Sequence, residues 1–188
     1  MKRAQMEMVG LVVIVILITL GMLIFAALSI SQGPKEKKIF TRKELAYSTL
    51  SALMKTTIEE GVCGFDFRPE LEADILEDCA AHVDNPSFST FQCEYNGQKL
   101  NSCEFFREIA SDLFEETLGN WNKRYEFQSR FIPYGVEAET EIRDLMEEPI
   151  KSSRGGCPAT RERDTSTIFP LSVEATGGQV QSVLYICD

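Results

Sequence analysis

The first 33 residues contain the longest apolar stretch of the chain. From Met8 to Ile30 no side chain is charged. A helix rises about 1.5 Å per residue, so a helix over this stretch would be long enough to cross the roughly 30 Å hydrocarbon core of a membrane. The stretch is also apolar on every side, whereas a surface helix of a soluble domain has a polar stripe. We therefore predict a transmembrane helix within residues 1–33, followed by a basic linker over residues 34–40.

A cleaved secretory signal and a buried core helix are the two alternatives for this stretch. Ala27, Leu28 and Ser29 include the small residues that signal cleavage requires, but a secretory signal has an apolar stretch of only about 7 to 15 residues. A core helix is disfavoured because the polar stripe is missing. Lysines and arginines lie on both sides of the stretch, so charge alone does not fix its orientation.

Three later segments have apolar residues at helical spacing. Thr41 and Glu44 form a capping-box pattern, in which each side chain accepts a hydrogen bond from a free backbone N–H. The first helix is therefore predicted to begin at Thr41 and to end at Gly61. Pro69 is suited to a first helical turn and predicts a second helix over residues 69–83.

A third helix is predicted after a turn at Asn96 and Gly97. Asn101 is followed three residues later by Glu104, which is again a capping box. Apolar residues then recur at helical spacing, and we expect them to pack in the core, because such aromatic stripes are more often core than ligand platforms. They are Phe106, Ile109, Leu113, Leu118 and Trp121.

Strand patterns dominate the last third of the chain. Within residues 123–132, the side chains of Tyr125, Phe127 and Ser129 alternate with those of Arg124, Glu126 and Gln128. Such alternation is typical of a half-buried strand, and Pro133 ends the pattern. Gly177 and Gly178 separate two further strand patterns and predict a hairpin. The last strand, over residues 179–187, is apolar enough to be central in a sheet.

Three weaker patterns complete the order of elements. Residues 88–95 indicate a short strand, residues 136–150 indicate a strand that leads into a helical turn, and residues 151–167 indicate a polar loop that Cys157 ties down. The predicted fold class is therefore α+β, with an N-terminal transmembrane helix followed by helices packed on a small antiparallel sheet.

Charge distinguishes the two parts of the chain. The whole chain has 19 basic and 29 acidic residues and a net charge of −10, but residues 39–188 carry 14 basic and 27 acidic side chains. The resulting charge of −13 excludes nucleic acid as an expected partner, because neutralising phosphates requires a basic surface.

Six cysteines all follow the apolar stretch. An even number in a domain of about 150 residues predicts three disulfides and an oxidising location, with a buried reduced set as the alternative. Zinc binding is disfavoured because the chain has no CxxC pair and only one histidine, His82. We expect the sequence-local pairs Cys93–Cys103 and Cys157–Cys187. The disulfide candidates are Cys63, Cys79, Cys93, Cys103, Cys157 and Cys187.

Basic, small and acidic residues precede the apolar stretch. Lys2 and Arg3 come before the small residue Ala4, Gln5 follows, and Glu7 lies just before the stretch begins. This order resembles the class III signal of archaeal type IV pilin-like proteins, over about the first 30 residues. The resemblance implies a pilin-like head, cleavage between Ala4 and Gln5 by a prepilin-type peptidase, and pairing of Glu7 with the terminal amine of a neighbouring subunit.

The spacing of the acidic residue leaves an alternative open. Glu7 would be the third residue of the mature chain, whereas the family has its carboxylate at the fifth. The alternative is an uncleaved signal anchor in which Lys2, Arg3 and Glu7 lie at the membrane interface.

No catalytic signature is present in the sequence. A Ser-His-Asp or Cys-His arrangement would have to use His82. The segment from Ser153 to Cys157 has two glycines but lacks the lysine and the spacing of a phosphate-binding loop. The acidic residues between Asp66 and Asp78 lack the EF-hand spacing that calcium requires. We therefore predict that the chain is not an enzyme and has no cofactor and no metal site.

These patterns predict a membrane-anchored, pilin-like structural subunit of a surface filament or membrane assembly, which displays a disulfide-stabilised acidic ectodomain over residues 41–188. Its expected partners are membrane lipid and further copies of the chain, through Met8 to Ile30. The expected location is the cell membrane, with a single pass and the C-terminal domain outside, or a surface filament. The alternative function is a stand-alone signal-anchored ectodomain that binds a surface partner.

Overall fold

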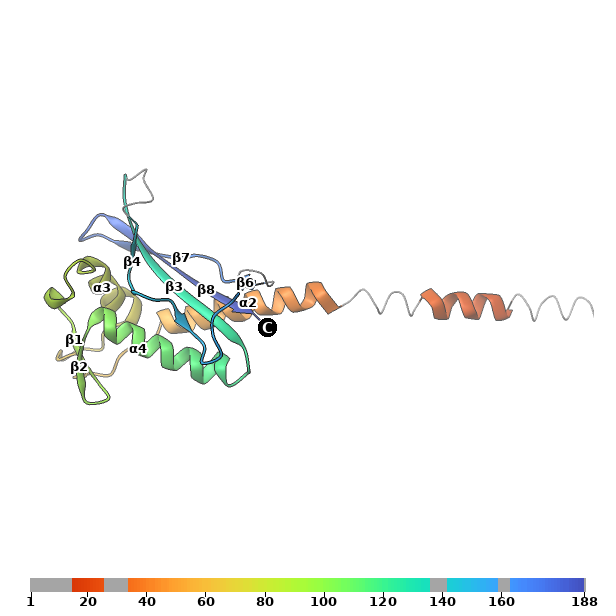
Figure 1. Cartoon of the computed structure of the whole chain (residues 1–188), viewed down its shortest axis with the longest axis horizontal. Helices are drawn as coiled ribbons and strands as arrows, with labels where there is room; N and C mark the ends of the chain where they lie inside the picture. The colour runs from red at the N-terminus through yellow and green to blue at the C-terminus, as the bar shows by residue number, and fades with distance from the viewer. Residues whose placement is uncertain (1–14, 26–33, 136–141, 159–162, 188) are drawn as a thin grey trace, which may run out of the picture. The chain divides into compact units, whose positions relative to one another are not determined.

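The computed structural model describes residues 15–25, 34–135, 142–158 and 163–187. The chain divides into two compact units, Met1–Thr41 and Arg42–Asp188. Residues 15–25 of the first unit are helical. The second unit consists of helices beside an antiparallel sheet (Figure 1).

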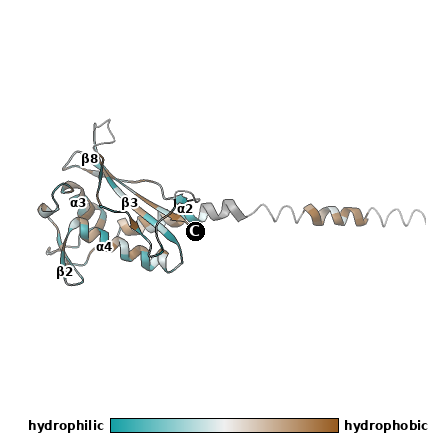
Figure 2. Cartoon of the chain, in the orientation of Figure 1, coloured by the Kyte–Doolittle hydropathy of each residue, from teal (hydrophilic) through white to brown (hydrophobic). Residues whose placement is uncertain are grey.

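The predicted transmembrane helix is wrong. Among the residues that the structure describes, no helix is both long enough and apolar enough to cross a membrane. The helix over residues 15–25 is largely apolar (Figure 2), but it rises only about 16 Å at 1.5 Å per residue. Helix α2 (Pro34–Met54) is longer but includes several lysines and glutamates. The rest of the predicted span, residues 1–14 and 26–33, lies outside the described residues.

Helix α2 begins at Pro34 and not at the predicted capping box of Thr41. Proline is well suited to the first helical position, which needs no backbone donor. The helix therefore includes the predicted linker over residues 34–40. It also ends at Met54, before the predicted Gly61. Its buried residues within the second unit are Ala46, Thr49, Leu50, Leu53 and Met54.

The second predicted helix is present as two short elements. A π-helical turn, η1 (Leu71–Leu76), continues into α3 (Glu77–Ala81). The spacing predicts that Leu71, Ile75, Cys79 and Val83 point inward; the first three are buried, and Val83 is partly buried. The apolar spacing therefore located this helix correctly.

The third predicted helix is also present. Helix α4 (Ser102–Phe114) begins with the predicted capping box of Asn101 and Glu104, and it continues as a π-helical turn, η3 (Glu115–Gly119). Trp121 lies beyond η3 and is 61% exposed. The prediction that Trp121 packs in the core is therefore wrong.

Two long strands form the centre of the main sheet. β3 (Arg124–Pro133) and β8 (Gly178–Cys187) are antiparallel and pair along their whole length. Both were predicted, and so was the hairpin that joins β8 to the preceding strand at Gly177. Shorter strands pair with the outer edges of these two: β4 (Arg143–Asp144) and β5 (Ile150–Lys151) with β3, and β6 (Arg163–Thr165) and β7 (Phe169–Val173) with β8.

One face of the main sheet packs with the helices in a shared hydrophobic core. Tyr125 and Phe127 of β3 face α4, where the ring centroid of Phe114 lies 5.6 Å and 5.2 Å from theirs. Their partners across the strands, Ile186 and Leu184 of β8, are buried as well. The alternation of side chains therefore has the predicted orientation, with the apolar set toward the helices.

A separate small hairpin precedes α4. Its strands are β1 (Gln92–Tyr95) and β2 (Gln98–Asn101). Asn96 and Gly97 form the turn with φ angles of 51° and 77°, values that suit asparagine and glycine better than other residues. Strand β1 is shorter than the strand predicted over residues 88–95, and Phe88 belongs instead to a 3-10 turn, η2 (Pro86–Phe88).

The segment between β4 and β5 has no helical turn, so that prediction is wrong. Pro149 disfavours a helical backbone at the residue before it. The backbone N–H of Leu145 instead donates to the carbonyl of Ser129 in β3 at 3.0 Å. The strand predicted before β4 lies mostly outside the described residues, at 136–141. The predicted loop over residues 151–167 includes β6.

Candidate functional site

Three disulfides connect all six cysteines, as predicted. One of the two pairs expected from sequence proximity, Cys157–Cys187, is confirmed. It joins the segment after β5 to the end of β8. The other two disulfides are Cys63–Cys93 and Cys79–Cys103.

The predicted pair Cys93–Cys103 is wrong. The backbone N–H of Glu94 in β1 donates to the carbonyl of Val62 at 2.8 Å. This contact holds the turn after α2 beside β1 and brings Cys63 to Cys93. The position of Cys63 beside β1 could not be read from the residues of β1, because Cys63 and Cys93 are 30 positions apart in the sequence.

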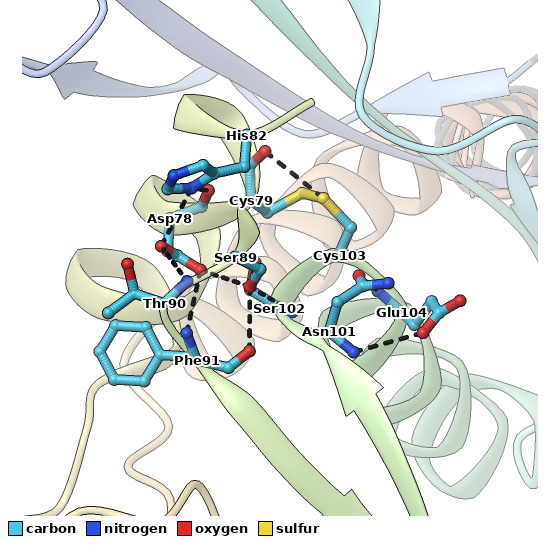
Figure 3. The surroundings of a disulfide bond; sticks show 10 residues. All are labelled: Asp78, Cys79, His82, Ser89, Thr90, Phe91, Asn101, Ser102, Cys103 and Glu104. Carbon is cyan, nitrogen blue, oxygen red and sulfur yellow. Dashed lines mark hydrogen bonds and ion pairs between the residues drawn. A yellow bond between two sulfur atoms is a disulfide. The ribbon is translucent and has the colours of Figure 1, made fainter. Parts of the chain in front are cut away.

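A buried carboxylate lies beside the disulfide that joins α3 to α4 (Figure 3). Asp78 of α3 accepts hydrogen bonds from the hydroxyl of Ser89 at 2.6 Å and from the backbone N–H groups of Thr90 and Phe91 at 3.0 Å and 3.3 Å. The backbone N–H of Ser102 donates to the Ser89 hydroxyl at 3.1 Å. This network therefore ties the segment before β1 to both α3 and α4.

The network keeps Asp78 ionised although it is buried. Desolvation is the largest single effect on the pKa of Asp78, and it raises this pKa. The hydrogen bonds from the Ser89 and Ser102 side chains and from the backbone N–H groups of Thr90 and Phe91 lower it, and together they hold the pKa of Asp78 below its ordinary value of 3.8. His82 lies on the same side, with Nδ1 at 3.2 Å from Oδ1 of Asp78. Because Nδ1 is also 3.0 Å from the Asp78 carbonyl, the imidazole packs against its own helix.

A groove of about 530 Å³ opens beside this disulfide, and we call it the α4 groove. Its walls are the turn after α3, the first turns of α4 and the segment that follows β4. Apolar side chains line part of it, including Val83 and the buried Leu145 and Met146. The groove therefore offers an apolar surface that opens to solvent.

Charged side chains surround the apolar part of the α4 groove. Glu104 and Arg107 come from α4, and Asp144 and Glu147 come from the segment on the opposite side. Three carboxylates thus face one guanidinium, so these four residues together are negatively charged. A partner with both apolar and cationic groups matches this combination.

Two ion pairs position the wall that follows β4. Arg143 of β4 pairs with Asp84 in the turn after α3, and Arg130 of β3 pairs with Asp144 at 2.9 Å. Both pairs are largely exposed, so each contributes at most about 1 kcal/mol to stability. Their main effect is to orient this wall against α3 and β3.

A second polar cluster lies at the C-terminal end of α4. Glu115 accepts hydrogen bonds from the hydroxyl and backbone N–H of Ser153 at 2.7 Å and 3.3 Å, and from the hydroxyl of Tyr125 at 2.9 Å. The bonds from Ser153 and then Tyr125 hold the pKa of Glu115 below its ordinary value. Burial, followed by the Glu115 contact, raises the pKa of Tyr125. The cluster fastens the segment before Cys157 to α4.

The polar groups beside the α4 groove do not form a hydrolytic relay. Ser89 donates its proton to Asp78, whereas a catalytic serine donates to a histidine. In the part of the chain that the structure describes, no three His, Cys, Asp or Glu side chains are grouped to hold a metal ion. The acidic residues from Asp66 to Asp78 therefore form no such group.

The residues predicted for processing and assembly, Ala4, Gln5 and Glu7, lie outside the described residues. The role of Asp78 in its hydrogen-bond network was not predicted from the sequence. Asp78 follows Ile75 by three residues and therefore lies on the same buried helix face. This spacing was the signal from which the burial of Asp78 could have been predicted.

Comparisons of the chain with protein-family models, with curated proteins and with solved structures find no match.

Proposed function

We propose that this chain is a pilin-like structural subunit of a surface filament or a related surface assembly, whose copies associate through the apolar N-terminal helix. The observation that carries the proposal is the exposure of that helix. Each of its large apolar side chains is between 50% and 74% exposed. They are Val15, Ile16, Leu17, Ile18, Leu20, Met22, Leu23, Ile24 and Phe25.

An exposed apolar helix favours association. Burial of apolar surface contributes roughly 25 cal/mol per Å², and large exposed apolar patches mark interaction surfaces. Apolar side chains follow one another along residues 15–18 and 22–25, so they are distributed around the helix and not along one stripe. Several partner helices can therefore surround it, as in the core of a filament.

The unit Arg42–Asp188 supports a display role outside the cytoplasm. Its three disulfides are typical of an oxidising compartment. Each disulfide contributes about 2 to 4 kcal/mol to the stability of such a domain. The acidic surface keeps the unit soluble through charge repulsion.

The assembly is tested by sedimentation of the full chain in native extracts. The double variant Leu17→Asp and Leu20→Asp should convert higher-order species to monomers, because charge would enter the apolar interface. Tyr47→Asp is the matched control, since Tyr47 is a similarly exposed large residue on α2. A wild-type chain that is monomeric at every concentration would overturn the proposal.

The pilin-type processing is tested by N-terminal sequencing and intact mass. We expect Gln5 as the first residue, and an increase of two hydrogen masses per disulfide on reduction. An intact Met1, or a start near Ile30, would contradict cleavage between Ala4 and Gln5. Glu7→Ala should also reduce higher-order species, whereas Glu59→Ala should not.

The α4 groove favours a second candidate function. In this alternative the chain does not self-assemble, and its acidic unit binds a surface partner. The two functions are distinguished by sedimentation of the wild-type chain, which remains monomeric under the second. The exposed apolar helix favours the first.

A further inference from the structure

We infer that the α4 groove is a docking site for the basic segment, residues 35–43, of a second copy of this chain. The inference rests on the proposed function, because it requires that copies meet in an assembly. It adds a head-to-neighbour contact to the helix association proposed above.

The groove has the chemistry to hold a segment that is both apolar and basic. Leu145 and Met146 are buried and form its apolar part. Glu104 and Glu147 are exposed beside them. Lysine side chains have apolar stems and a charged end, so their stems can cover such a surface while their amines reach the carboxylates.

The basic segment is the complementary part of the chain. Five of its nine residues are lysine or arginine, although residues 39–188 as a whole carry −13. In the sequence, the apolar residues Ile39 and Phe40 lie between Lys38 and Arg42. No other nine residues of the chain hold as many basic side chains.

Assembly itself makes this contact favourable. Acidic units held close together repel one another, and a cationic segment placed between them offsets the repulsion. A charged contact of this kind fixes orientation and register more than it adds affinity. The contact between the basic segment and the α4 groove would thus set the rotation of each copy about its N-terminal helix relative to the neighbouring copy.

A second copy is the occupant favoured over the same chain. Arg42, at the end of the segment, forms an ion pair with its own Asp164 at 2.7 Å. Asp164 belongs to β6, and β6 contributes no residue to the described lining of the groove. Arg42 of each copy is therefore held at its own β6 and outside the lining of its own groove.

The test is zero-length carbodiimide cross-linking of the full chain, with equal amounts of ¹⁵N-labelled and unlabelled protein. We expect isotopically mixed cross-linked peptides that join lysines of the basic segment to Glu104, Glu147 or Asp144, the three carboxylates of the groove. In the double variant Glu104→Gln and Glu147→Gln, positions 104 and 147 can no longer be cross-linked, so the yield is read at Asp144, which keeps its carboxylate. Loss of docking should lower the yield of cross-links to Asp144 about 2- to 10-fold. Glutamine at position 104 retains the capping box, so α4 is preserved.

The matched control is the double variant Glu59→Gln and Glu60→Gln, which removes two exposed carboxylates away from the groove. It should leave the yield unchanged. A second arm reverses the charges: chains with Glu147→Lys, mixed with chains that carry Lys37→Glu and Lys38→Glu, should form cross-links between the exchanged positions.

The outcomes separate this inference from the proposed function. If the chain assembles but mixed cross-links at the groove are missing, or occur within one copy only, the docking inference is wrong and the subunit function stands. If the wild-type chain does not assemble, the proposed function fails first. Cross-links to Asp144 that keep the wild-type yield in the groove variant would also overturn the inference.

Discussion

Two regions of the unit Arg42–Asp188 are stabilised in different ways. The cystine region, residues 55–103, consists of turns, the short helix α3 and a small hairpin, joined by two disulfides and the Asp78 network. The sheet region, residues 124–187, is built on β3 and β8, which pair over ten residues, and has one disulfide. Short elements bury little surface each and depend on cross-links, whereas long paired strands share a continuous apolar face.

The largest expected effect is in the core of the sheet region. Phe127→Ala should lower the free energy of unfolding by about 3–5 kcal/mol, because it removes a fully buried ring. Gln128→Ala, on the opposite face of the same strand, should cost less than about 1 kcal/mol. Urea unfolding measures both. If Phe127→Ala and Gln128→Ala lowered the free energy of unfolding equally, the sheet region would not depend on its buried face for stability.

The cystine region should respond most to loss of its covalent links. Replacing Cys79 and Cys103 by serine opens a link over 24 residues and should lower the free energy of unfolding by about 3–4 kcal/mol. Amide hydrogen exchange should increase within residues 55–103 while β3 and β8 remain protected.

Serine at Cys157 and Cys187 is the matched control, since it opens a link of 30 residues. In that variant, exchange should increase near β6 and at the end of β8, and the cystine region should keep its protection. If both cysteine variants increased amide hydrogen exchange equally in the cystine region and in the sheet region, the two regions would not be stabilised in different ways.

A smaller effect should distinguish the regions by pH. Asp78→Asn should cost about 1–3 kcal/mol at neutral pH, because the new amide cannot accept all the donors that face Asp78. The folded pKa of Asp78 is below 3.8, so its contribution is fully present above 3.8 and is lost as pH falls through the folded pKa. The difference between wild type and variant in unfolding free energy should therefore shrink on acidification. A constant difference would show that the charge is not responsible.

The smallest effect is expected at the junction of α4 with the sheet region. Glu115→Gln removes the charge that accepts from Ser153 and Tyr125. Trypsin should then cleave after Arg154 about 2- to 5-fold faster, as the segment is released more often. Glu116→Gln, an exposed neighbour, is the control. Equal cleavage rates in all three chains would show that Glu115 does not fasten the segment.

Several features were predictable because their signals are local. The capping box of Asn101 and Glu104, the alternation along β3 and the turn at Gly177 each depend on residues within one element or one tight turn. Predictions failed where a distant segment decides the outcome. Trp121 continues the helical spacing of α4, but it lies beyond η3, where the chain turns toward β3.

The sequence by itself determined the division into an apolar N-terminal stretch and an acidic α+β unit, because composition and periodicity are properties of the chain alone. Tertiary structure decided that Cys63 pairs with Cys93, that Asp78 stays ionised while buried, and that Glu104 and Glu147 meet across one groove. These features depend on distances and desolvation between segments that are far apart in the chain, and such distances exist only once the helices and the sheet have packed.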